Sequence, residues 1–221
     1  MAKVIISYDG TENDGDALAL GRLLADPGDL ALAYIRHSRE LDPQRENVAQ
    51  HDAEQRLARG AELLGRPEVP QHVVFGGSTG AALEELASAE GASIVVFGSD
   101  YRTQTGHAEP PNSAQRLLEI GAIAIAVAAS GLRVQPPESI ATIAVVSPDG
   151  DETALRSAQA LAGERGGRVA GLDGTGADLI VVGSQPGAPA GRVALGGAAR
   201  TALDASRGSV LVVPSGKPLG A

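Results

Sequence analysis

The sequence predicts an α/β protein made of two tandem doubly wound parallel-sheet units, of which the second is truncated. Short apolar runs rich in β-branched residues alternate with longer runs that have helical spacing, which is typical of a parallel sheet covered on both faces. The same alternation restarts after a proline-containing stretch at 131–139. The length of 221 residues corresponds to about one and a half domains at the usual ~150 residues per domain, which fits a full unit and a shorter one.

The first unit is expected over residues 1–130 and contains five candidate strands and four candidate helices. Each strand is a short apolar run, and turn or capping residues separate it from the next helical segment. Thr79 is expected to cap the third helix, and Asn112 or Ser113 the fourth. The strands are expected at 4–8, 30–35, 72–77, 93–99 and 122–129, and the helices at 16–25, 44–65, 81–90 and 113–121.

The second unit is expected over residues 140–216, between a linker at 131–139 and a tail at 217–221. Pro136 and Pro137 prevent regular structure in the linker. The second unit has only a short turn between residues 172 and 177, so it lacks counterparts of the long helix, the third strand and the helix that follows. Its strands are expected at 140–146, 168–172, 177–184 and 209–215, with a first helix between 147 and 167 and a last helix at 201–208.

Composition and charge exclude several classes of protein. Lys and Arg number 18 against 27 Asp and Glu, and the net charge of -9 lies in residues 1–132, which hold 19 acids and 10 bases. An acidic chain without a basic block is a poor ligand for nucleic acid. The absence of Cys excludes a disulfide framework, a thiolate zinc site and a Cys nucleophile. No apolar run approaches the ~18 residues of a membrane helix, and no signal-peptide pattern opens the chain, so a cytoplasmic location is expected.

The order of these motifs resembles that of the universal stress protein family in its tandem form. The resemblance covers nearly the whole chain: VIISYDGT with DALAL, then VVFGG, then IVVFGS with NSAQRLL and AIAIAV, and later DLIVVGS, GRVALGG and SVLVV. It implies a five-stranded α/β fold with strand order 3-2-1-4-5, in a family of which many members bind ATP and others have regulatory or interaction roles. It also implies that the last strands, 123–127 and 210–213, pair antiparallel as in family dimers, giving an intramolecular pseudo-dimer that leaves a further homodimer open.

The resemblance implies a nucleotide site in the first unit. Asp9 matches the family Asp after the first strand, and Gly98 matches the first glycine of a phosphate loop whose pattern is Gly, two residues, Gly, nine residues, Gly-Ser or Gly-Thr. Such a loop brings backbone N–H groups and a helix N-terminus to the phosphates. Tyr101 replaces the second glycine, and Asn112-Ser113 replace Gly-Ser one residue late. The intervening Glu109, Pro110 and Pro111 add negative charge and remove donors.

The corresponding site of the second unit departs further from the pattern. Gly183 matches the first glycine, Pro186 replaces the second, and Gly196 and Gly197 replace Gly-Ser. Ser147 and Pro148 displace the acid, which becomes Asp149. ATP is therefore expected, if anywhere, in the first unit. Two functions stay open: a nucleotide-binding regulatory module, and an interaction or scaffold protein of the stress response without nucleotide, whose protein partner the sequence does not identify.

An enzymatic function is not expected, although one motif suggests a remote alternative. Gly76–Gly80 fits the G-x-S-x-G pattern between a strand and a helix, which would make Ser78 a nucleophile with Asp100 and His107 following in the order of a hydrolase triad.

The four His have no metal-ligand spacing, so no metal is expected. Tyr8 stands at the carboxyl end of the first strand, at the rim where ligands bind in open α/β sheets, and His37 follows the second strand. The alternative interpretations are a strand residue that covers an adjacent helix for Tyr8 and a solvated loop residue for His37.

Overall fold

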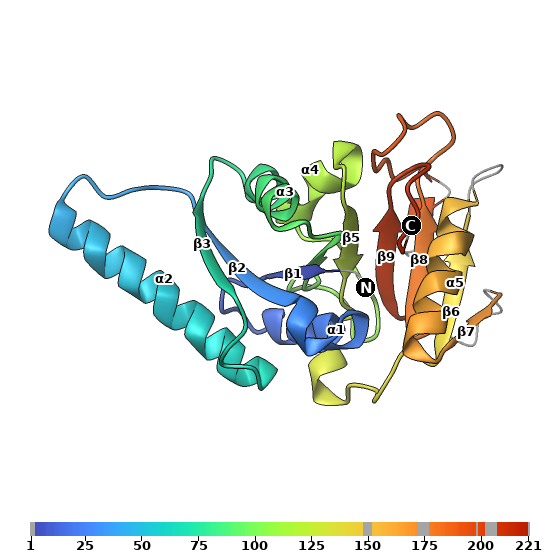
Figure 1. Ribbon diagram of the computed structural model, residues 1–221, viewed down its shortest axis with the longest axis horizontal. Helices are drawn as coiled ribbons and strands as arrows, with labels where there is room; N and C mark the ends of the chain where they lie inside the picture. The colour runs from blue at the N-terminus through green and yellow to red at the C-terminus, as the bar shows by residue number, and fades with distance from the viewer. Residues whose placement is uncertain (1–2, 148–151, 172–176, 198, 202–206, 221) are drawn as a thin grey trace.

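The computed structural model describes residues 3–147, 152–171, 177–197, 199–201 and 207–220. Their strands form one nine-stranded sheet with the order β3-β2-β1-β4-β5-β9-β8-β6-β7, which runs from left to right in Figure 1. The strands of the first unit are β1 (Val4–Ser7), β2 (Leu30–Arg36), β3 (Gln71–Phe75), β4 (Ile94–Phe97) and β5 (Ala124–Val127). Those of the second unit are β6 (Thr142–Val146), β7 (Arg168–Ala170), β8 (Leu179–Gly183) and β9 (Ser209–Val213).

The pairing of these strands confirms the predicted fold class. In the first unit, β3, β2, β1, β4 and β5 pair in parallel in the order 3-2-1-4-5. In the second unit, β7, β6, β8 and β9 pair in parallel in the same order, and its described residues contain no counterpart of β3. The two units meet where β5 pairs antiparallel with β9, with Ala126 opposite Leu211. The antiparallel pairing of the two last strands that the resemblance implies is therefore present.

Helices cover both faces of this sheet. The helices that lie wholly within the described residues are α1 (Asp14–Leu24), α2 (Pro43–Leu64), α3 (Thr79–Glu90), α4 (Asn112–Ile120) and α5 (Thr153–Arg165), together with the short 3-10 helices η1 (Pro27–Asp29) and η2 (Leu132–Val134). Figure 1 shows α3 and α4 on one side of the first unit and α1 on the other, while α2 extends outward beyond β3. No helix in the described part of the chain is long and apolar enough to cross a membrane.

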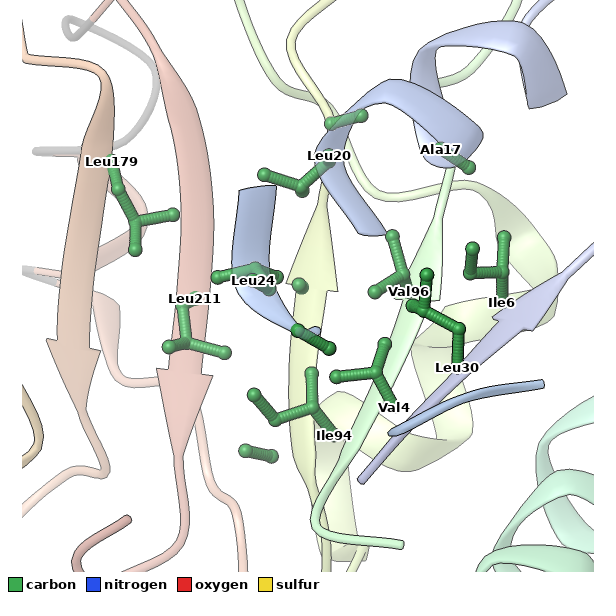
Figure 2. Packing of buried hydrophobic residues seen from close by; sticks show 14 of the residues in the cluster. Val4, Ile6, Ala17, Leu20, Leu24, Leu30, Ile94, Val96, Leu179 and Leu211 are labelled. Carbon is green, nitrogen blue, oxygen red and sulfur yellow. The ribbon is translucent and has the colours of Figure 1, made fainter. Parts of the chain in front are cut away.

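The core has one layer on each face of the sheet, because neighbouring strand residues point to opposite faces. Val4 and Ile6 pack in the layer under α1, α2 and α5, whereas Ile5 packs in the layer under α3 and α4. Leu179 and Leu211 of the second unit belong to the same layer as Val4 (Figure 2). The apolar core therefore runs through the junction of the two units without a break.

Residues 131–139, expected as a linker, lie against α1. Gly131 N and Arg133 N donate to the two carboxylate oxygens of Asp16, at 2.9 and 2.7 Å, and the Arg133 guanidinium pairs with the same carboxylate at 2.8 Å. Asp16 is fully buried in α1. The second unit adds a further tie, since Arg165 of α5 pairs with Asp26 at 2.7 Å. The chain between the two units is thus fixed in place by hydrogen bonds to α1.

Two helix caps differ from the sequence prediction. Ser78, and not Thr79, is the N-cap of α3, and its hydroxyl accepts from Ala81 N at 3.3 Å. Pro111 occupies the N-cap position of α4, so neither Asn112 nor Ser113 caps that helix. The prolines before α4 hold the chain extended and thereby determine where the helix starts. A prediction based on polar capping residues does not detect this kind of helix start. The helix expected at 201–208 falls largely outside the described residues.

Candidate functional site

A cavity of about 440 Å³ lies at the carboxyl ends of β1 and β4. It collects three of the four residues predicted for the nucleotide site of the first unit, namely Asp9, Gly98 and Ser113. The fourth, Asn112, is the exposed first residue of α4 and does not line the cavity. The crevice at the carboxyl ends of parallel strands is the usual ligand position in open α/β sheets.

The cavity wall is acidic. Asp14 organises the turn after β1, because its Oδ2 accepts from Asp9 N at 2.9 Å and from Thr11 N at 2.8 Å. Burial raises the pKa of the Asp14 carboxyl, and burial followed by the charge of Asp14 raises the pKa of Asp9. Glu12 and Asp100 also line the cavity. This wall disfavours a phosphate, since like charges in a desolvated site repel.

The space next to Gly98 is occupied by the protein itself. A Cβ at this position would lie 2.4 Å from the carbonyl oxygen of Asn13, so the residue must be glycine for the turn before α1 to pack against the end of β4. The Asn13 side-chain amide donates to Ser99 O at 2.8 Å and fastens the same contact. The glycine thus admits the backbone of Asn13, at the place where the family pattern predicts the approach of a phosphate.

The backbone N–H groups of the loop after β4 are largely engaged within the loop. Asp100 N donates to Glu109 O at 2.9 Å, and Thr103 N donates to Asp100 O at 3.0 Å. Arg102 N donates to the Asp100 carboxylate at 3.0 Å. Tyr101, which replaces the second glycine, is 74% exposed. A phosphate would have to displace these acceptors, because a phosphate loop binds through N–H groups that point at the ligand.

Ser99 and Ser184, which the sequence analysis did not single out, hold equivalent positions in the two units. Ser99 Oγ donates to Ala128 O at 2.6 Å and accepts from Glu109 N at 3.1 Å. Ser184 Oγ donates to Val213 O at 2.8 Å and accepts from Ala194 N at 3.1 Å. Each hydroxyl therefore ties the loop after the fourth strand to the end of the last strand. The repeated Gly-Ser at the end of the matching strand motifs was the available signal.

The three glycines predicted for the nucleotide site of the second unit have different neighbours in the structure. Gly183 is the last residue of β8 and pairs with Val213. A Cβ at Gly196 would lie 3.0 Å from Gln185 Cβ, whereas Gly197 is exposed with open space beside it. Asp149, the displaced acid, lies outside the described residues. A role for these glycines in binding stays a prediction.

The structure does not assemble the triad that the hydrolase alternative requires. The Ser78 hydroxyl caps α3, and no hydrogen bond within the described residues joins it to Asp100 or His107. His37 lies beside the same turn, with Nδ1 2.9 Å from Gly76 O and Nε2 3.3 Å from Thr79 Oγ1. The described residues contain no cluster of three or more His, Asp or Glu side chains able to hold a metal ion.

Comparison with solved structures identifies the fold. A universal stress protein of Pseudomonas aeruginosa matches with a TM-score of 0.62 at 15% identity, over 97% of this chain and 94% of that one. A second P. aeruginosa protein, of unknown function, matches with the same score and identity over 96% and 93%. A universal stress protein of Archaeoglobus fulgidus matches with a TM-score of 0.56 at 15% identity over 97% and 99%. No family model and no curated protein matches the sequence. The chain thus has the fold of universal stress proteins of tandem length.

Proposed function

We propose that this chain is a regulatory protein with the universal stress protein fold that acts through contacts with a protein partner and does not bind ATP in its first unit. The observation that carries the proposal is that protein atoms already occupy the positions where the loop after β4 would bind phosphates. The space at Gly98 is filled by the carbonyl of Asn13, and the loop N–H groups of Asp100, Arg102 and Thr103 already have acceptors. An acidic wall with raised pKa values at Asp9 and Asp14 acts in the same direction.

ATP binding in the first unit is the second candidate, and one observation favours it. Asp9, Gly98 and Ser113 line a single cavity at the carboxyl ends of two adjacent strands. Its volume of about 440 Å³ lies within the range for small-molecule sites. Under this candidate the Asp9 carboxylate accepts from the ribose hydroxyls, and the loop after β4 rearranges to release its N–H groups.

Calorimetry separates the two candidates. The full chain, purified without added nucleotide, is titrated with ATP, and a denatured sample is assayed for nucleotide that copurifies. We expect no heat above dilution and no nucleotide. Submicromolar binding to the wild-type chain that disappears in Asp9→Ala would establish the ATP candidate instead. Asp29→Ala, at a partly exposed position of η1 outside the cavity, is the matched control for the loss of one carboxylate.

A further inference from the structure

A second and larger cleft lies between α1 and α2, with a volume of about 870 Å³. Tyr8 and Gly10 line this cleft, whereas Ser7 and Asp9 line the cavity at the end of β4. Alternate residues of an extended segment point to opposite faces of a sheet, so the two sites lie on different sides of the segment that follows β1. The volume is within the range for small-molecule sites.

The charge of this cleft is opposite to that of the chain. Its lining holds four arginines and two acids, in a protein with a net charge of -9. One of the arginines, Arg133, is paired with Glu12 and with the buried Asp16. Convergent arginines are the usual protein partners of phosphate and carboxylate groups. The charged residues of the lining are Arg22, Arg56, Arg59, Arg133, Glu12 and Asp52.

Two glycines make room for two of these arginines. A Cβ at Gly10, whose φ is +81°, would lie 3.1 Å from Arg56 Cγ, and a Cβ at Gly15 would lie 2.8 Å from Arg133 Cδ. Arg56 also donates to the Tyr34 hydroxyl at 2.8 Å and lies 4.8 Å from the centre of that ring. Because Tyr34 is a neutral partner, the positive charge of Arg56 is not compensated by this contact.

The other two cationic groups and one phenol lack partners. Arg22 and Arg59 make no ion pair or hydrogen bond with the part of the chain that the structure describes, and neither does the Tyr8 hydroxyl. Tyr8 is only 3% exposed, and its ring fits against Gly60 of α2, where a Cβ would lie 2.8 Å from the ring. Burial, and then the charge of Asp14, raise the pKa of the Tyr8 phenol, so it keeps the proton it can donate.

We propose that this cleft binds a small organic anion, with a phosphate or carboxylate group on an apolar body. The anionic group is met by the guanidinium groups of Arg22 and Arg59 and by the phenol of Tyr8. The apolar body lies against Leu18 and Leu63, which line the same cleft. Leu63 is 63% exposed without a ligand, and a bound apolar body would cover it.

Calorimetry on the full chain with three probes of one shape tests this proposal. The probes are 1-naphthyl phosphate, 1-naphthoate and the uncharged 1-naphthol, so the first two distinguish phosphate from carboxylate and the third measures the apolar part alone. We expect at least one anion to bind with a stoichiometry of one and 1-naphthol to bind far more weakly. Arg59→Gln and Arg22→Gln should each weaken the anion at least about tenfold, the scale of one charge-assisted hydrogen bond.

Two further variants control for the loss of a positive charge elsewhere on the chain and for a loss of structure. Arg45→Gln removes the same charge from the exposed start of α2, outside the cleft, and should leave the affinity unchanged. Tyr8→Phe keeps the ring against Gly60 and should weaken binding through the lost hydroxyl alone, with unaltered circular dichroism. The proposal is overturned if neither anion gives heat, if 1-naphthol binds as tightly as the anions, or if Arg45→Gln weakens binding as much as Arg59→Gln.

Discussion

Gly98 has a packing role that does not depend on a ligand. Gly98 matches the first position of a phosphate loop in sequence, yet its missing side chain accommodates the Asn13 carbonyl. We expect Gly98→Ala to lower the free energy of unfolding by about 1–3 kcal/mol, because the new methyl group would overlap backbone atoms at 2.4 Å. Urea denaturation followed by circular dichroism measures this change.

Gly163→Ala is the matched control for that substitution. Gly163 lies within α5 and has no atom within 4 Å of its would-be Cβ, so alanine there should raise stability by about 0.5–1 kcal/mol through helix propensity. If Gly98→Ala proved as stable as the wild-type chain, the turn before α1 would be able to shift away from residue 98. The space beside residue 98 would then be accessible to a phosphate.

The Asp9 carboxyl gives the acidic cavity a pH dependence with a definite sign. Its pKa is raised from the ordinary 3.8, by burial first and by Asp14 second, so ionisation of Asp9 disfavours the folded state. Stability linked to this group is present below its unfolded pKa and is lost as the pH rises through the folded pKa. Asp9→Asn should therefore raise stability relative to the wild-type chain at pH 7.

Urea denaturation at pH 7 and at pH 4 measures this difference. The advantage of Asp9→Asn should shrink as the pH falls, because the wild-type carboxyl then becomes protonated and loses its penalty. Asp29→Asn, at a partly exposed position outside the cavity, controls for the change in net charge. An advantage that stays constant between the two pH values would mean that the charge of Asp9 is not its cause.

At the level of elements, the sequence predicts the strands, which depend on periodicity. It does not predict the exact helix ends, which depend on the loops before them. The strands and their order follow from apolar runs and from the resemblance, and β8 was predictable because Ala177–Ser184 repeats Ala92–Ser99. The start of α4 at Asn112 was misjudged because a proline, not a polar side chain, precedes the helix. Helix ends are set by local contacts that periodicity does not encode.

The candidate sites likewise contain residues that the sequence predicts and contacts that it does not. Asp9, Gly98 and Ser113 were predictable as neighbours, since they follow strands whose carboxyl ends meet at one edge. The contact between Gly98 and Asn13 was not, because no spacing rule says which backbone fills a glycine's space. The arginine cleft was equally hidden, since Arg22 and Arg59 come together only through the packing of α1 beside α2.

At the level of the molecule, the second unit completes the sheet of the first. β9 pairs with β5 along Ile125–Val127, and both core layers continue across this junction. An apolar edge strand without a partner is a template for pairing with another chain. Arg133 and Gly131 add polar ties from the connecting segment to the buried Asp16. The shortened second unit keeps the strands that reach this junction. The part of it that the structure describes has no counterpart of β3, which lies at the far edge of the first unit.

A chain that ends at residue 131 should therefore associate. Its β5 would lose Val210, Leu211 and Val212 as antiparallel partners and would expose Ile125 and Val127, which are at most 1% exposed in the full chain. Sedimentation velocity across a range of protein concentrations should show the fragment as a dimer or larger species. The full chain, run at the same concentrations, is the reference. A fragment that is folded by circular dichroism and remains monomeric would show that the first unit does not need this partner strand.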